Sequence, residues 1–378
     1  MNAESIAIEA PVQQAPQRVL ATSGSQIVAT VDISAEGKHQ GYLQLPHSTH
    51  RSAYGKILIP IVVIRNGAGP TVLLTAGNHG DEYEGQIACM KIARQLQCDS
   101  ISGAIMIIPA LNFPAVSAGQ RTSPIDAGNL NRSFPGMRNG SPTQQIAHFV
   151  ESVLLPQVDY VIDLHSGGSS LEFAAPTLVA RRARTQDDLN DQMRHVNSFG
   201  APLTYLTQEA TGNDTGMMGA CVRAGVKHFT TELGGGGSVS IDGVNVGVSG
   251  TMRLLHSIGL INGVYRQPAC PSTKILERGG LHSDDFVFAL EKGIFEPAVE
   301  LGTEVTAGQV AGHIHFYHAP WRDPQVYHFK QNGMAIARFR SGMVEMGDAL
   351  FVTAKELNHK PSRGIPGKVR SGFPSGIS

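Results

Sequence analysis

The chain has 378 residues, of which 41% are hydrophobic and 16% are charged, and its formal net charge is −1. This balance is typical of a folded globular protein and excludes a largely disordered chain. A nearly neutral chain lacks the basic excess that nucleic acids and anionic membrane surfaces attract. We therefore expect a small molecule as partner, with no nucleic acid and no membrane.

Targeting signals and redox-active patterns are sparse. The segment MNAESIAIEAPVQQAP contains no basic residue and no long apolar core, so it lacks the features of a secretory signal. The longest apolar runs, at 57–64 and 105–111, have the length of strands and are too short to cross a bilayer. Four scattered cysteines predict neither a disulfide framework nor a zinc knuckle; they are Cys89, Cys98, Cys221 and Cys270. A cytoplasmic protein is expected.

The first half of the chain alternates strand-like and helical segments. Residues 1–25, rich in Ala, Pro and Gln, are expected to form a mobile tail. Apolar, β-branched runs predict strands, and apolar residues at helical spacing predict helices. On these patterns, strands are predicted at 27–33, 41–45, 56–64, 70–77, 103–111 and 160–164, helices at 86–96 and 143–155, and a turn-rich loop at 112–140.

The second half continues this alternation and then changes character. Helices are predicted at 183–198 and 217–225, an extended segment at 201–207 and a strand at 227–233. Such alternation favours a mixed or parallel sheet covered by helices, with ligands beyond the carboxyl ends of the strands. A chain of this length is too long for a single hydrophobic core, so we expect two domains. They are an α/β domain at 26–264 and a β-rich domain at 265–359, followed by a mobile tail at 360–378.

Two histidines and a glutamate follow predicted strands and form a candidate metal site. His79 and Glu82 lie in an H-G-D-E loop after the strand TVLLTAG, and His165 ends the strand VIDLH. Two His and one Glu are the protein ligands of many catalytic zinc sites, in which the fourth position is open to water. A single histidine is more often structural, so the prediction depends on the set. Cobalt or manganese could occupy the same ligands.

Hydrolysis of an amide also requires a base and a cation near the metal. Glu232 ends the strand KHFTTEL directly before the glycines 234–237 and is the candidate base; the alternative is a surface glutamate in a turn. Arg121 and Arg132 lie in the loop GQRTSPIDAGNLNRSFPG. One could stabilise the oxyanion, and the other, beside Asn131, could grip a substrate carboxylate. A plain surface loop is the alternative.

Four motifs together resemble a known family. NHGDEYEG, NLNRSFPG, DLHSGG and TELGGGG, within about residues 40–350, resemble the succinylglutamate desuccinylase/aspartoacylase family of zinc carboxypeptidase-like hydrolases. The resemblance implies a three-layer α/β/α zinc-peptidase-like domain with a mixed sheet, plus a smaller C-terminal β domain. NLNR stands where DLNR is more usual in the family.

The resemblance also implies a role for each matching residue. One Zn²⁺ per subunit would be held by His79, Glu82 and His165. Glu232 would be the general base and acid, and Arg121 would assist the oxyanion. Asn131 and Arg132 would receive the α-carboxylate of a small N-acyl amino acid.

Within the family, the motifs look closest to the branch that deacetylates N-α-acetyl-L-2,4-diaminobutyrate during ectoine breakdown. Such a substrate carries a side-chain amine, so an acidic residue should line its pocket; Glu209 and Asp214 are candidates, and an exposed polar loop is the alternative. Desuccinylase or aspartoacylase activity and a non-catalytic metal-binding protein remain as competing hypotheses. Whether copies of the chain form a homo-oligomer stays open.

Overall fold

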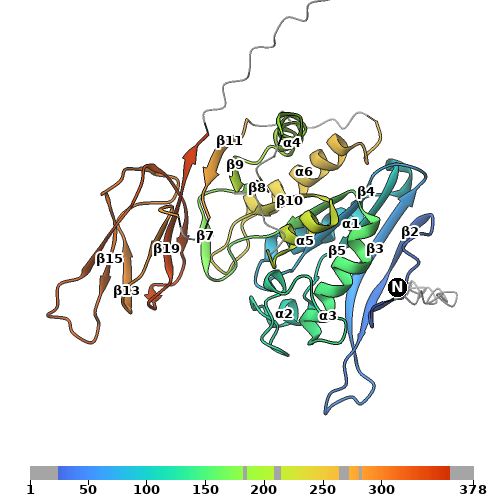
Figure 1. Ribbon diagram of the computed structural model, residues 1–378, viewed down its shortest axis with the longest axis horizontal. Helices are drawn as coiled ribbons and strands as arrows, with labels where there is room; N and C mark the ends of the chain where they lie inside the picture. Colours follow the sequence, from blue (N-terminus) through green and yellow to red (C-terminus); the bar gives the residue numbers. More distant parts are fainter. Residues whose placement is uncertain (1–23, 182–184, 208–213, 264–271, 281–282, 358–378) are drawn as a thin grey trace, which may run out of the picture.

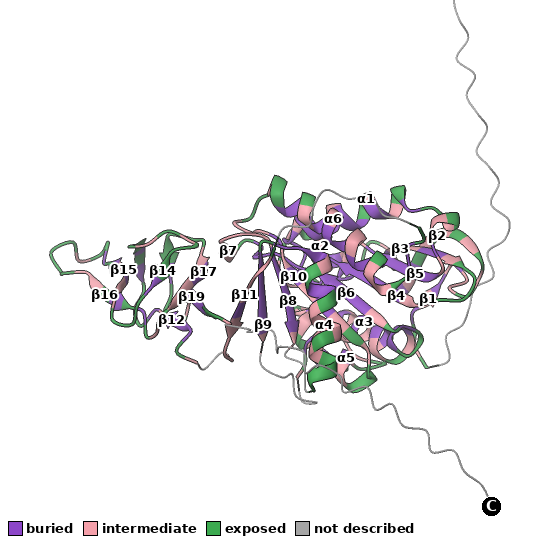
Figure 2. Cartoon of the chain, turned by 90° about the horizontal axis from the view of Figure 1, so that it is seen from above, coloured by how far each residue is buried: buried purple, intermediate pink, exposed green. Residues whose placement is uncertain are grey.

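The fold combines a large mixed sheet, covered by helices, with a separate four-stranded antiparallel sheet (Figures 1 and 2). The computed structural model describes residues 24–181, 185–207, 214–263, 272–280 and 283–357. This architecture confirms the predicted α/β class. Glu209, Cys270 and nearly all of the two expected tails lie outside the described residues.

The helices pack against a part of the large sheet that contains nine strands. Their order is β1-β2-β3-β5-β4-β6-β10-β8-β9, and β4, β5, β6 and β10 run parallel to one another. The side chains of β4, β5 and β6 are almost entirely buried, as expected for strands covered on both faces. The bounds are β1 Val28–Ala29, β2 Gly37–Pro46, β3 Lys56–Asn66, β4 Thr71–Ala76, β5 Gly103–Ile108, β6 Tyr160–Leu164, β8 Thr177–Arg181, β9 Leu203–Thr207 and β10 Lys227–Glu232.

Each face of this sheet has its own hydrophobic core. One core includes residues of α1 (Tyr83–Gln95), α4 (Gln186–Phe199) and α6 (Ile241–Ile258). The other includes residues of α3 (Pro142–Phe149) and α5 (Met217–Ala224), and Phe113 at the start of α2 (Phe113–Ala118) packs against it. Short helical turns complete this part of the chain: η1 Cys98–Ser100, η2 Leu130–Arg132, η3 Val150–Leu154 and η4 Leu155–Gln157.

The large sheet continues past β9 into the C-terminal strands. β11 (Lys274–Arg278) pairs in parallel with β9 and antiparallel with β19 (Ala349–Glu356). β7 (Leu171–Phe173), β12 (Phe286–Phe288), β14 (Glu304–Val305) and β17 (Gly333–Phe339) complete it. The second sheet contains β13 (Gly293–Pro297), β15 (Val310–His315), β16 (Gln325–His328) and β18 (Met343–Val344). The predicted division at 264/265 remains a proposal, since backbone pairing joins the two sections.

Several predicted elements differ in extent. The helix expected at 143–155 is α-helical only to Phe149 and ends in a π-helical turn and a 3₁₀ turn, the latter containing Pro156. The strand expected at 27–33 is reduced to β1, and the loop expected at 112–140 contains α2 and η2. β7, β8 and the helix α6 were not predicted.

The described helices lack the features of a membrane span. None of them is long and apolar enough to cross a bilayer.

Candidate active site

Three adjacent parallel strands bring the predicted chemical residues to one edge of the sheet. In the order β4-β6-β10, His79 follows β4, His165 directly follows β6, and Glu232 is the last residue of β10. The carboxyl ends of parallel strands meet at one edge, which is where open α/β sheets bind ligands. The alternation of strands and helices therefore gathers residues that are far apart in the sequence.

Two glycines allow the loop after β4 to turn tightly. Gly77 has a φ of 71°, a conformation that favours glycine. A Cβ on Gly80 would lie 2.0 Å from the carbonyl oxygen of Ala115, so the loop passes directly against α2. Gly80 N–H donates to the Gln120 carbonyl oxygen at 2.8 Å, which holds the loop in place. The helix α1 begins immediately after Glu82.

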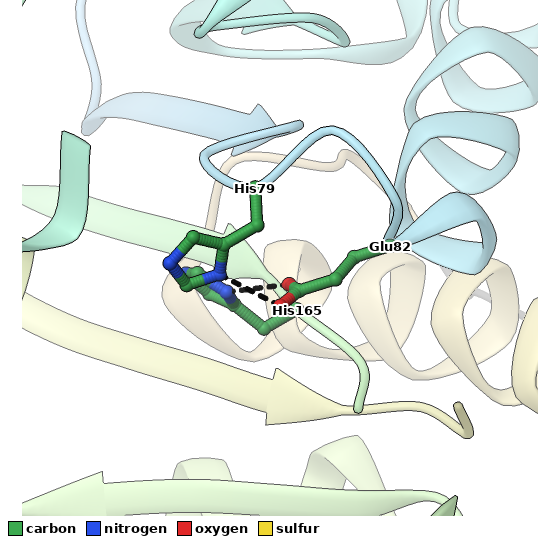
Figure 3. Close-up of side chains that lie close together, drawn as sticks. All are labelled: His79, Glu82 and His165. Atoms are coloured by element: carbon green, nitrogen blue, oxygen red, sulfur yellow. Dashed lines mark hydrogen bonds and ion pairs between the residues drawn. The ribbon is translucent and has the colours of Figure 1, made fainter. Parts of the chain in front are cut away.

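The three candidate metal ligands converge on one point. One ligand atom of each of His79, Glu82 and His165 lies within 4.8 Å of the others, and all three residues are buried. The carboxylate of Glu82 points toward both rings, with Oε1 2.7 Å from His79 Nδ1 and Oε2 2.7 Å from His165 Nδ1 (Figure 3).

The other ring nitrogen of each histidine contacts a fixed oxygen. His79 Nε2 lies 3.2 Å from Asn129 Oδ1, and His165 Nε2 lies 2.9 Å from Asp163 Oδ2. Asp163 also accepts hydrogen bonds from Thr75 and Asn78. Such contacts orient a metal-binding histidine and fix its tautomer, leaving Nδ1 for the metal. Sequence reasoning missed both oxygens, although the D-x-H spacing of Asp163 and His165 was an available signal.

The electrostatics of this cluster suit a cation. Burial opposes a charge on His165, but the Asp163 and Glu82 carboxylates outweigh it and raise its pKa. Burial lowers the pKa of His79. Burial also opposes ionisation of Glu82, yet the two imidazoles hold its pKa well below the usual value. Ionised, buried carboxylates beside imidazole nitrogens, which give up their protons when a metal binds, fit Zn²⁺, which prefers this donor set.

The turn after His165 is fixed by a carboxylate from the His79 loop. Asp81 Oδ2 accepts hydrogen bonds from the backbone N–H of Ser169 at 2.8 Å and from its hydroxyl at 2.6 Å. The buried Asp81 therefore connects the two segments that carry the candidate ligands.

The two loop arginines occupy different places. Arg121 Nη1 lies 3.6 Å from Glu82 Oε1 and 3.4 Å from His79 Nδ1, so its guanidinium borders the metal cluster. Arg132 Nη1 donates to the Asn131 carbonyl oxygen at 2.7 Å. Asn131 Oδ1 in turn accepts from the N–H of Met217 at 2.8 Å, which fixes this loop against the start of α5.

A cavity of about 490 Å³ is lined by His165 of the metal cluster and by the carboxylate-binding candidates Asn131 and Arg132. Its walls also include Glu232 and Asp214. Asp214 Oδ1 accepts from Gly216 N–H at 2.8 Å. Asp214 is the described member of the predicted acidic pair.

Glu232 differs sharply from the ligand carboxylate. Burial raises the pKa of Glu232 to about 8, and the charge on Glu82 adds to the rise, while His165 and Arg121 oppose it. A carboxyl group with a pKa near neutrality is suited to take up and return a proton.

Arg278 is a further charged residue of the cavity that sequence reasoning missed. Its guanidinium carbon lies 5.5 Å from the centre of the Tyr205 ring and 5.4 Å from that of Phe286. Arg278 and Tyr205 both line the cavity. No local motif marks them, because β9 and β11 are brought to the site only by the fold.

Comparison with known proteins adds independent information. Residues 68–258 match the catalytic domain of the succinylglutamate desuccinylase/aspartoacylase family. The chain is 38% identical, over 88% of its length and 95% of the relative's, to an N-alpha-acetyl-L-2,4-diaminobutyric acid deacetylase of Halomonas elongata. Among solved structures, it is similar to the product-bound ectoine utilization protein EutE (DoeB) of Ruegeria pomeroyi (35% identity, TM-score 0.81, coverage 88% of this chain and 99% of that one). A succinylglutamate desuccinylase/aspartoacylase of Rhodobacter sphaeroides has 34% identity and a TM-score of 0.82, with coverage of 89% and 100%.

Proposed function

Because the chain belongs to the succinylglutamate desuccinylase/aspartoacylase family, we propose that it is a zinc-dependent amidohydrolase acting on a small N-acyl amino acid. The observation that carries this proposal is one cavity lined by Glu232, Arg132 and His165, the last of which forms a cluster with His79 and Glu82. A metal site, a base of raised pKa and a carboxylate-binding arginine are what amide hydrolysis on such a substrate requires.

In this proposal the metal would be held by the imidazoles of His79 and His165 and by the carboxylate of Glu82. Bound there, Zn²⁺ would polarise the substrate carbonyl and make water a better nucleophile. Asn129 and Asp163 would keep the two imidazoles oriented.

The residues of the chain divide the remaining work. Glu232 removes a proton from the attacking water as its oxygen bonds to the acyl carbon, and returns the proton to the amide nitrogen as the C–N bond breaks. Arg121, beside the metal cluster, faces the negative charge that develops on the carbonyl oxygen. Arg132 and Asn131 hold the α-carboxylate. The products are the free carboxylate of the acyl group and the free amino acid.

For the substrate, we propose N-α-acetyl-L-2,4-diaminobutyrate. The named relative at 38% identity supports this choice, and so does the carboxylate of Asp214 in the cavity wall. A carboxylate there would attract the side-chain ammonium group, while Arg132 binds the α-carboxylate at the other end of the amino acid. The ammonium group and the α-carboxylate of the substrate would thus each lie beside a side chain of opposite charge.

A panel of substrates tests this assignment. Zinc-loaded enzyme should hydrolyse N-α-acetyl-L-2,4-diaminobutyrate with a higher kcat/KM than N-acetyl-L-2-aminobutyrate, which lacks the ammonium group. Asp214→Asn should reduce that preference by about 10-fold or more, since a hydrogen bond to a charged group contributes roughly 1.5–3 kcal/mol. Equal rates on the two substrates would refute the proposed role of the side-chain amine.

The second candidate is desuccinylase or aspartoacylase activity, and Arg278 favours it. This guanidinium in the same cavity could bind an additional substrate carboxylate. Faster hydrolysis of N-succinyl or N-acetylaspartate substrates in the same panel would support it. No turnover of any N-acyl amino acid by zinc-loaded protein would instead support a non-catalytic metal-binding protein.

A further inference from the structure

Glu84 is a fully buried carboxylate that the proposed mechanism does not use. It lies in the first turn of α1, two residues after the candidate ligand Glu82, and has 0% of its surface exposed. Glu84 Oε1 accepts a hydrogen bond from the backbone N–H of Ser240 at 3.0 Å, whereas Oε2 is buried and has no hydrogen-bond partner among the described residues. Burying a carboxylate is costly, so this position requires an explanation.

The Ser240 contact places Glu84 at the start of a long helix. Ser240 is the N-cap of α6, which has 18 residues. The amino end of a helix carries a partial positive charge and unpaired N–H groups, both of which stabilise a carboxylate. Glu84 therefore connects the segment of the candidate metal ligands to α6.

The same side chain fits closely against the glycines that follow Glu232. A Cβ on Gly234 would lie 2.6 Å from Glu84 Oε1, closer than real atoms approach. A Cβ on Gly243 would lie 3.0 Å from Glu84 Cγ. The absence of side chains at both positions lets Glu84 occupy the space between the end of β10 and the first turn of α6.

Backbone hydrogen bonds extend this arrangement to the metal cluster. Leu233 N–H donates to the His165 carbonyl oxygen at 2.9 Å, and Gly167 N–H donates to that of Gly234 at 3.1 Å. Residues 233–234 are thus held on one side by the backbone around His165 and on the other by the side chain of Glu84. Glu232 immediately precedes residues 233–234, so their position also limits where Glu232 can lie.

We propose that Glu84 is a positioning residue that fixes the carboxylate of Glu232 relative to the metal ligands. This inference rests on the proposed function, because it assigns Glu84 to the support of the base. Since a displacement of about 1 Å at a reacting group can cost roughly 100-fold in rate, a support of this kind has a measurable effect.

Substitution of Glu84 separates positioning from folding. Glu84→Ala should lower kcat by about 10- to 100-fold, with KM and zinc content near those of the wild type, because the metal and carboxylate sites are retained. Glu84→Gln keeps an oxygen for the Ser240 N–H and should restore most of kcat. A kcat of Glu84→Ala within twofold of the wild type, or no recovery in Glu84→Gln, would overturn the proposal.

A double-mutant cycle tests the contact itself. Gly234→Ala should lower kcat in the wild-type background, where its Cβ collides with Glu84. In the Glu84→Ala background the collision is absent, so the same substitution should cause a much smaller additional loss. Additive losses would show that the two residues act independently and would contradict the proposal.

Ser240→Ala is the matched control. It removes the hydroxyl that accepts a hydrogen bond from Gly243 N–H. It keeps the backbone N–H of residue 240, which donates a hydrogen bond to Glu84. It should therefore lower Tm without a comparable loss of kcat; a kcat loss equal to that of Glu84→Ala would contradict the proposal.

Crystal structures of the wild type and Glu84→Ala supply a readout that is independent of activity. The Glu232 carboxylate should move relative to His165 in the variant. If the wild type hydrolyses no substrate of the panel, the proposed function fails, while this displacement still decides the role of Glu84. An unmoved Glu232 would refute that role even in an active enzyme.

Discussion

The proposed mechanism gives some side chains of the site the task of holding a metal and gives Glu232 the task of moving a proton. Glu232→Gln keeps size and polarity but removes the proton acceptor. Zinc content should stay near that of the wild type, while kcat at neutral pH should fall by about 10²–10⁴-fold. Elemental analysis and acetate release from the best substrate measure the two quantities. Loss of zinc from this variant would make Glu232 a ligand, and retained activity would require another base.

The raised pKa of Glu232 also predicts a pH dependence of stability in the metal-free protein. The folded state favours the protonated form, so this contribution is fully present below the ordinary pKa of 4.5 and is lost as the pH rises through about 8. Relative to Glu232→Gln, the free energy of unfolding of the wild type should fall over this range, by at most about 1.4 kcal/mol per pH unit. Urea unfolding of both metal-free proteins at several pH values measures the difference. Parallel pH curves would contradict the burial of this carboxyl group.

Arg132 should contribute mainly to binding. If Arg132 binds the α-carboxylate as proposed, that contact is present in both the ground state and the transition state, so Arg132→Ala should raise KM more than it lowers kcat. A charged hydrogen bond is worth roughly 1.5–3 kcal/mol, which corresponds to an increase in KM of about 10- to 100-fold. Steady-state kinetics with the best substrate provides the test. An unchanged KM would remove Arg132 from the substrate site.

At the level of elements, the loop between β4 and α1 depends on its close approach to α2. Gly80→Ala would place a Cβ 2.0 Å from the backbone of Ala115, and neither backbone can yield easily. We expect a loss of about 1–3 kcal/mol in stability together with weaker zinc binding, because Glu82 lies in the same loop. Gly342→Ala, where a Cβ would meet nothing within 4 Å, is the control. Equal effects of the two substitutions in urea unfolding would refute the close approach.

The sequence predicted many elements with strong local patterns, but it missed the 18-residue helix α6 as well as the short strands β7 and β8. The apolar runs of β4, β6 and β10 were recognised, and the residues at their ends lie together because neighbouring parallel strands end at one edge. β8 was not recognised as a strand. It nevertheless lies between β10 and β9 and forms part of the cavity floor.

Some residues of the site were not predicted from the sequence because only the folded structure brings them there. Asn129 and Asp163 were unassigned because each acts through a histidine rather than through a motif of its own. Arg278 lies far along the chain from the four motifs and reaches the cavity only through the pairing of β11 with β9. Local patterns carry no information about such pairings.

At the scale of the whole molecule, the site draws on distant parts of the chain. The candidate ligands and base lie between residues 79 and 232, while Arg278 and Gly279 extend the cavity wall to β11 and the loop after it. β11 also pairs with β19, so the cavity and the C-terminal strands belong to one hydrogen-bonded sheet. Tests of function should therefore use all 378 residues rather than a fragment without the C-terminal strands.

The central claim is that a metal held by His79, Glu82 and His165 supports hydrolysis of an N-acetylated amino acid. The most direct measurement is the rate of acetate release from N-α-acetyl-L-2,4-diaminobutyrate by the full chain, before and after removal of the metal with a chelator and after readdition of zinc. Release should stop in the metal-free protein and return with about one Zn²⁺ per chain. Release that continues unchanged without metal, or that is absent from the zinc-loaded protein, would contradict the account.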